Sequence, residues 1–191
     1  MGREFELKYR ADEAVISAIA GALGGFAAIS METTYYDTPE RALSALRWTL
    51  RRRLEDGVSV CTVKTPAPGG ARGEWETECG DIAAAIPALC ALGAPRELAA
   101  LTAEGVVEVC GARFTRLAAE IALEACTVEL ALDRGVLLGG GKELPLAEVE
   151  VELKSGSEEA AVAFAESLAA RFGLVPEPMS KYKRALGLAE R

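Results

Sequence analysis

Two runs of alternating residues, one near each end of the chain, constrain the fold more than any other feature. The first is Glu4-Phe-Glu-Leu-Lys8, and the second is Glu148-Val-Glu-Val-Glu-Leu-Lys154. In a β-strand, side chains two positions apart share a face, so each run places its carboxylates in one row and its apolar residues opposite. Carboxylates about 6.6 Å apart repel by roughly 0.6 kcal/mol in water and about 2.5 kcal/mol at an effective dielectric of about 20. Each row therefore either faces solvent or surrounds cations.

Composition excludes several classes of function. The chain has 191 residues, half of them apolar, which suffices for one domain with a sizeable core. Its net charge of −8 argues against nucleic acid as a partner, because proteins that bind the phosphate backbone usually carry a net positive charge. The chain contains no histidine, which excludes Ser-His and Cys-His catalysis and imidazole zinc sites. Carboxylates, Lys, Arg and Tyr must perform any chemistry.

The cysteines and the apolar stretches favour a cytoplasmic protein with no membrane association. Five cysteines are widely spaced and form no CxxC pair, which indicates buried thiols rather than disulfides or a zinc site. The charged N-terminus does not resemble a signal peptide, and Glu6 breaks the myristoylation pattern. The longest apolar stretch, residues 82–95, is interrupted by Pro87 and is too short to span a bilayer.

Period-two patterns, turn signals and helix caps predict eight strands with few helices. Strands are expected at 3–9, 32–38, 46–54, 58–65, 73–79, 113–123, 125–133 and 147–155. Helices are expected at 11–23, 82–92, 95–104 and 157–172. Asp133-Arg134-Gly135 and Gly139-Gly140-Gly141 are interpreted as part of the connection between the last two strands. The expected fold class is α+β, an eight-stranded antiparallel closed β-barrel, or tunnel, with peripheral helices, in a single domain over residues 1–191.

Several expected strands carry charged side chains at every second position. Arg51 and Arg53 form such a pair, Lys64 lies on the returning strand, and Glu74 and Glu76 follow Arg72. If these faces turn inward, the tunnel is lined by acidic and basic rows, which require water, divalent cations and a polyanion to be tolerated. Oxygen ligands alone select hard ions, Mg²⁺ or Mn²⁺. Carboxylate-held metal beside Arg and Lys is the arrangement that phosphoryl transfer needs.

Each motif alone has a simpler explanation. The first alternating run fits a solvated strand, and the Glu148 run fits an edge strand protected against aggregation. Arg51-Arg52-Arg53 fits a surface hairpin, and Tyr35-Tyr36-Asp37-Thr38-Pro39 fits a strand followed by a turn. The combination of all of them favours the tunnel.

The ordered set of motifs resembles the CYTH superfamily, the triphosphate tunnel metalloenzymes. The resemblance spans essentially the whole chain. The motifs, in chain order, are Glu4 to Lys8, Tyr35 to Pro39, Leu50 to Arg53, Thr62 to Pro66, Arg72 to Glu76, Glu129 to Gly135, Glu148 to Lys154, and Ser180-Lys-Tyr-Lys-Arg184.

The resemblance implies a role for each matching residue. Phosphate oxygens would be held by Lys8, Arg51, Arg53, Lys64, Arg72, Arg116, Lys181 and Arg184, with Arg113 as the alternative to Arg116. Metal would be held by Glu4, Glu6, Asp133, Glu148 and Glu150, with Glu74, Glu76, Glu129 and Glu152 as further tunnel carboxylates. Catalytic roles would fall to Lys8, Glu148, Glu150 and Glu152, one of the carboxylates accepting the proton of the attacking water.

The function expected from the resemblance is metal-dependent hydrolysis of inorganic triphosphate, with Mg²⁺ or Mn²⁺ as cofactor. The alternatives are an adenylate cyclase or a thiamine-triphosphatase that uses the same tunnel, and a non-catalytic polyphosphate-binding module. Bacterial members of this kind often continue into a helical CHAD domain, so the chain is expected to form the first part of a longer protein.

Overall fold

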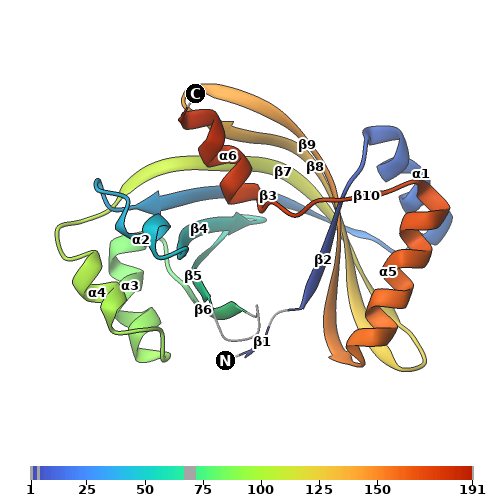
Figure 1. The fold of residues 1–191 in the computed structure, drawn as a ribbon, viewed down its shortest axis with the longest axis horizontal. Coiled ribbons are helices and arrows are strands. Elements are labelled where there is room, and N and C mark those ends of the chain that lie inside the picture. Colours follow the sequence, from blue (N-terminus) through green and yellow to red (C-terminus); the bar gives the residue numbers. More distant parts are fainter. Residues whose placement is uncertain (1, 4, 67–71, 191) are drawn as a thin grey trace.

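The N-terminal segment joins the two ends of one curled antiparallel sheet. The computed structural model describes residues 2–3, 5–66 and 72–190. The strands are β1 (Gly2–Arg3), β2 (Glu6–Arg10), β3 (Ala27–Asp37), β4 (Thr49–Glu55), β5 (Val58–Pro66), β6 (Arg72–Glu78), β7 (Val107–Ala122), β8 (Cys126–Gly139), β9 (Lys142–Gly156) and β10 (Val175–Pro176). Their order is β1-β6-β5-β4-β3-β7-β8-β9-β2-β10. Because β1 pairs with β6 and β2 pairs with β9, residues 2–10 bridge both sides of the sheet, which curls into a tunnel (Figure 1).

The described residues form six helices, five of which cover the convex face of the sheet in two groups. They are α1 (Glu13–Leu23), α2 (Ala42–Ala45), α3 (Ile82–Ala91), α4 (Glu97–Leu101), α5 (Glu158–Phe172) and α6 (Lys181–Ala189). Figure 1 shows α1 and α5 on one side of the curled sheet and α3 and α4 on the opposite side. The predicted α+β architecture, with eight longer antiparallel strands and peripheral helices, is confirmed for the described residues.

Alternation along the strands separates the cores from the tunnel. On β9, Val149 and Val151 are buried in a cluster with Ile16 and Ile19 of α1 and Leu168 of α5. The intervening glutamates therefore point to the concave face. A second cluster packs α3 and α4 against the convex face of β4 and β5. The central part of β9 thus turns its valines toward the helices and its glutamates toward the interior.

Helix α6 differs from the others because it packs on the concave side. Ala185 is fully buried in a cluster with Met31, Phe114 and Leu146, residues of three different strands. Gly139 of β8 allows this close approach, since a Cβ atom there would lie 2.2 Å from the carbonyl oxygen of Ala185. The helix begins at Lys181, with Ser180 as its N-cap accepting from the Lys183 amide at 3.2 Å. Two of the predicted phosphate ligands, Lys181 and Arg184, therefore enter the tunnel from a helix.

The predicted end of the strand at residues 125–133 was wrong. Asp133-Arg134-Gly135 does not leave the sheet but lies within β8, where Asp133 pairs with Glu148 and Gly135 with Leu146. The turn to β9 comes only at Gly140 and Gly141, which adopt φ of 57° and 72°. Pairing with β7 and β9 on both sides outweighs the turn propensity of the local sequence. Asp133 is consequently in the middle of the tunnel wall rather than at its rim.

Candidate active site

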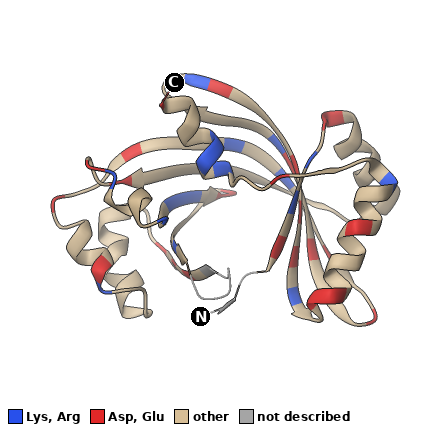
Figure 2. Cartoon of the chain, in the orientation of Figure 1, with Lys and Arg blue, Asp and Glu red and all other residues tan. Residues whose placement is uncertain are grey.

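Charged side chains from seven of the eight longer strands line one cavity of about 820 Å³, to which β3 contributes Ile29, Met31 and Tyr35. Figure 2 shows Lys, Arg, Asp and Glu distributed along the strands that surround it. The described lining contains seven carboxylates, Glu6, Glu55, Glu74, Glu76, Glu129, Glu150 and Glu152. It contains seven cations, Lys8, Arg51, Arg53, Lys64, Arg116, Lys154 and Lys181. The tunnel is therefore highly charged but close to balanced.

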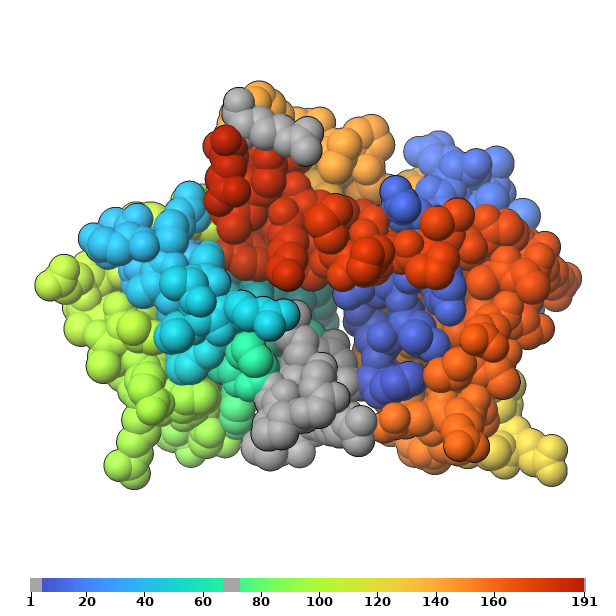
Figure 3. Space-filling view, viewed as in Figure 1, coloured from blue at the N-terminus to red at the C-terminus, as the bar shows by residue number. Residues whose placement is uncertain are grey.

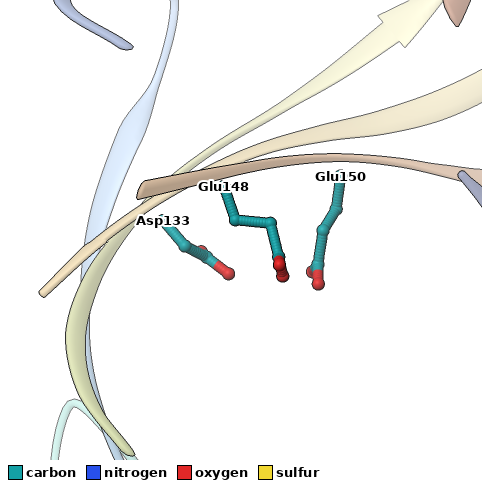
Figure 4. A group of neighbouring side chains, drawn as sticks. All are labelled: Asp133, Glu148 and Glu150. Atoms are coloured by element: carbon teal, nitrogen blue, oxygen red, sulfur yellow. The ribbon is translucent and has the colours of Figure 1, made fainter. Parts of the chain in front are cut away.

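Three carboxylates converge in the most buried part of the wall. Asp133 of β8 and Glu148 and Glu150 of β9 are exposed by 0%, 0% and 7%. Ligand oxygens of the three lie within 4.8 Å of one another. Figure 4 shows all three side chains projecting to the same side of the strands. We call these residues the carboxylate trio.

Three cations neutralise the carboxylate trio. Arg116 of β7 donates to both oxygens of Asp133, at 2.8 and 2.7 Å, and also pairs with Glu150. Lys181 Nζ lies 2.8 Å from Asp133 Oδ2 and 2.5 Å from Glu150 Oε1, and also contacts Glu148. Arg184 pairs with Glu148. Removing one partner of a buried ion pair leaves an unpaired buried charge, which is strongly destabilising. A change in any one of these six side chains is therefore expected to affect the other five.

Burial and pairing change the pKa values within this unit. Burial raises the pKa of Glu148 to about 6, although Lys181 opposes the effect. Burial acts in the same direction on Glu150, but Lys181 and Arg116 outweigh it and hold the pKa of Glu150 well below its usual range. Burial lowers the pKa of Lys181, whereas Glu150 and Asp133 more than reverse this and keep the amine protonated. Glu148 is thus the most readily protonated of the two glutamates.

A second group of cations occupies the wall formed by β4 and β5. Arg53 is desolvated, and its pKa is lowered first by burial and then by the nearby charges of Arg51 and Arg116. Its guanidinium lies 3.3 Å from Glu55, which is 40% exposed. Glu74 lies 3.6 Å from Arg51 and 3.2 Å from Lys64. A bound anion would stabilise a desolvated guanidinium that lies beside other cations.

Unpartnered guanidinium atoms indicate where such an anion fits. Among the described side chains, Arg51 Nε and Arg184 Nε are buried without a hydrogen-bond partner. A buried N–H without an acceptor costs about 1–3 kcal/mol, so an oxyanion at these positions would stabilise the site.

The remaining tunnel carboxylates group separately. In the strand register, Glu152 of β9 lies opposite Glu6 of β2 and Glu129 of β8. Its carboxylate lies 3.0 Å from the amine of Lys154. Lys154 also lies 3.6 Å from Glu129, and Lys8 lies 3.3 Å from Glu6. Glu152 therefore belongs to this more open layer and not to the carboxylate trio, although all three β9 glutamates share one face.

The geometry also distinguishes the two arginine candidates of β7. Arg116 lines the cavity, whereas the side chain of Arg113 is 62% exposed and pairs with Glu143. Glu4 and the side chain of Arg72 lie outside the described part of the chain. The roles assigned to all these residues remain predictions.

Sequence analysis missed one group of side chains beside the tunnel. Tyr182 lines the cavity, and its hydroxyl lies 2.7 Å from Ser44 Oγ, which in turn donates to the buried Asp37. The motif Tyr35 to Pro39 was interpreted only as a strand and a turn. An aspartate directly before a turn, followed seven residues later by a serine, was the available signal.

A family model described as the CYTH domain matches residues 2–186. The chain belongs to the CYTH family. A CYTH relative from Haemophilus influenzae, named inorganic triphosphatase, is 28% identical over 160 residues, which cover 83% of this chain and 46% of that protein. The chain thus spans about half the length of this curated relative.

Solved structures support the CYTH fold. A candidate adenylyl cyclase from Hippeastrum, described as having a dominant triphosphatase activity, has a TM-score of 0.65 at 16% identity, covering 95% of this chain and 94% of that one. A protein from Pyrococcus horikoshii has a TM-score of 0.63 at 24% identity, with 98% and 99% covered. A candidate adenylate cyclase from Bacillus halodurans has a TM-score of 0.62 at 19% identity, with 94% and 96% covered. Among the described residues of this CYTH chain, no helix has the length and apolar character needed to cross a membrane.

Proposed function

We propose that this chain hydrolyses the terminal phosphoanhydride bond of inorganic triphosphate in a reaction that depends on Mg²⁺ or Mn²⁺. The observation that carries the proposal is the position of the buried carboxylate trio directly against Arg116 and Lys181 inside a charged tunnel. Such a site places carboxylates that can bind a metal ion beside basic side chains that can bind phosphate oxygens of the same substrate. The activity in the name of the Haemophilus influenzae relative agrees with it.

The donor set of the carboxylate trio fits a hard divalent cation. Asp133, Glu148 and Glu150 offer only oxygen atoms, and these lie close enough to share one ion. Glu6, Glu74 and Glu76 line the same cavity as Glu150 and are proposed as further ligands, as is Glu4 from the sequence. A bound Mg²⁺ or Mn²⁺ would neutralise phosphate charge and lower the pKa of a coordinated water.

The cations of the tunnel would bind the phosphate oxygens. Arg51, Arg53 and Lys64 present positive charge from β4 and β5, and Arg116, Lys181 and Arg184 from the opposite wall and α6. The unpartnered Nε atoms of Arg51 and Arg184 supply donors that the protein itself does not use. Lys8 and Arg72 are proposed to extend this set. Triphosphate would then replace part of the carboxylate pairing of Lys181 and Arg184.

Hydrolysis requires an acceptor for one proton of the attacking water. The water oxygen bonds to the terminal phosphorus, the bridging P–O bond breaks with its electron pair, and pyrophosphate and orthophosphate are formed. Glu148 is proposed as the acceptor, because its pKa of about 6 makes it more basic than Glu150. Glu152 lies in the more open layer with Lys154 and is proposed to orient water or metal rather than to accept the proton.

One assay tests the proposal against its alternatives. The purified chain is incubated with triphosphate, thiamine triphosphate or ATP and with Mg²⁺ or Mn²⁺, and orthophosphate, pyrophosphate and cyclic AMP are measured. We expect orthophosphate and pyrophosphate from triphosphate at the highest kcat/KM, and loss of activity with EDTA. Glu148→Gln should be inactive, whereas Glu143→Gln, an exposed site on the same strand, should match the wild type. Cyclic AMP from ATP would favour a cyclase, and binding without turnover would favour a polyphosphate-binding module.

A further inference from the structure

Helix α6 is tied to α2 and to the C-terminal end of β3 by a chain of part-buried hydrogen bonds. Tyr182 Oη lies 2.7 Å from Ser44 Oγ, and Ser44 Oγ donates to a carboxylate oxygen of Asp37. Ser44 belongs to α2, and Asp37 is the last residue of β3. In Figure 3 the C-terminal segment crosses this face of the molecule and meets the α2 region. We call these three residues the α6 anchor.

The direction of each hydrogen bond in the α6 anchor follows from the available protons. Asp37 is completely buried and also accepts from the backbone amides of Thr38, Leu43 and Ser44, at 2.8, 2.9 and 3.0 Å. A carboxylate can only accept, so the single hydroxyl proton of Ser44 goes to Asp37. Tyr182 must therefore donate to Ser44. Burial raises the pKa of Tyr182, which keeps the donor protonated at neutral pH.

The α6 anchor also orders α2 itself. Arg41 and Arg47, on either side of α2, adopt φ of 63° and 61°, which L-residues rarely do. Two of the three amides that Asp37 accepts from, those of Leu43 and Ser44, lie between these two positions. The carboxylate thus holds a strained segment in one conformation, and this segment presents Ser44 to α6.

Tyr182 lies where it can control the first turn of α6. Its ring packs on Tyr35 with centroids 5.0 Å apart, and Tyr35 pairs with Arg51 across β3 and β4. Lys181 directly precedes Tyr182 and inserts into the carboxylate trio, while Arg184 follows one turn after the N-cap. A shift of this turn would move both cations relative to the carboxylate trio, because both belong to α6.

We propose that Tyr182 is a positioning residue, which acts through Ser44 and Asp37 to fix Lys181 for binding the triphosphate. The inference rests on the proposed function and extends it to a side chain whose hydroxyl is directed to Ser44. If Tyr182 acts in this way, its hydroxyl contributes to triphosphate binding only through Lys181. Removing the hydroxyl should then have no effect in a variant that lacks Lys181.

The test is calorimetric binding of triphosphate in EDTA, combined with kcat and KM in Mg²⁺. Tyr182→Phe keeps the ring and removes only the hydroxyl, and Ser44→Ala breaks the same bond from the other side. Tyr9→Phe is the matched control, since Tyr9 is similarly buried but packs in the convex core under α1 and α5. Tyr182→Phe and Ser44→Ala should each weaken binding by about tenfold, and the double variant should be no worse than either single one.

The decisive comparison uses Lys181→Met. In that background, Tyr182→Phe should change the dissociation constant by less than about twofold. An equal loss with and without Lys181, or a Tyr182→Phe variant that binds like Tyr9→Phe, would overturn the positioning role. A wild-type protein that binds and hydrolyses no triphosphate would instead overturn the proposed function, and the inference with it. Circular dichroism and thermal unfolding of every variant separate either result from misfolding.

Discussion

Arg116 and Asp133 face each other across β7 and β8 and form a two-bond ion pair, with nitrogen-oxygen distances of 2.8 and 2.7 Å. Asp133 is fully buried, and Lys181 reaches the same carboxylate at 2.8 Å. The aspartate thus connects a strand arginine to a helix lysine. Its removal would leave the two cations with Glu150 as their remaining shared partner.

Asp133→Asn should therefore reduce both activity and stability. We expect kcat/KM for triphosphate to fall by about 100-fold or more, since even outer-shell changes at metal sites cost roughly 10- to 100-fold. The free energy of unfolding should fall by about 3 kcal/mol, because one partner of a buried pair is lost. Steady-state kinetics and urea unfolding measure the two effects. Glu143→Gln serves as the control, and equal activity of the two variants would contradict the assignment of Asp133.

Arg51→Ala should act mainly on substrate affinity. The side chain lines the cavity and has a buried, unpartnered Nε, so its contribution is expected in binding phosphate oxygens. We expect KM to rise by roughly 10- to 100-fold with a smaller change in kcat. The neighbouring Arg52 donates instead to the carbonyl of Gly80, 3.0 Å away, and Arg52→Ala is the matched control. An unchanged KM in Arg51→Ala would count against the phosphate site.

The pKa of Glu148 predicts a pH dependence of the metal-free protein. Its folded-state pKa, raised by burial to about 6, exceeds the ordinary value of 4.5. The stability that comes from this protonation is fully present below about pH 4.5 and is lost as the pH rises through 6. Mn²⁺ binding should weaken over the same range as the pH falls, because metal and proton compete for one carboxylate. Both trends, measured by thermal unfolding and by titration with Mn²⁺, should be smaller in Glu148→Gln.

Gly139→Ala should displace α6. A Cβ atom at this position would lie 2.2 Å from the carbonyl oxygen of Ala185, so the strand or the helix must move. We expect a loss of about 1–3 kcal/mol in the free energy of unfolding, together with lower triphosphatase activity and faster proteolysis near the C-terminus. Gly21→Ala is the control, because no atom lies within 4 Å of the added Cβ on the exposed side of α1. Its stability, activity and rate of proteolysis should match the wild type. If Gly139→Ala is cleaved near the C-terminus at the wild-type rate, α6 tolerates the change and the prediction is wrong.

The fold was largely predictable because period-two alternation is a local property of each strand. The run Glu148 to Lys154 shows it clearly, with its valines in the convex core and its glutamates in the tunnel. The extent of β8 was not predictable, since Gly135 and Gly139 resemble turn residues in sequence. The strand conformation of Gly135 depends on pairing with Phe114 of β7 and Leu146 of β9, whereas Gly139 ends the strand and pairs with Lys142 across the turn.

The sequence was sufficient to predict which residues belong to the candidate site, but not which of them contact one another. Glu150 and Glu152 share a face and a motif, yet Glu150 is buried against Lys181 and Arg116 while Glu152 pairs with the partly exposed Lys154. The difference arises because α6 covers one end of the tunnel. Nothing in the local pattern around Ser180 to Arg184 had predicted that this segment is a helix on the concave face.

The most direct test of the central claim is an anomalous-scattering map of crystals soaked in Mn²⁺ with a non-hydrolysable triphosphate analogue. The account predicts a Mn²⁺ peak within bonding distance of Asp133, Glu148 and Glu150, with phosphate oxygens on Arg51, Arg53 and Lys181. Mn²⁺ bound only outside the tunnel, or an analogue that leaves Arg51 and Lys181 untouched, would contradict it.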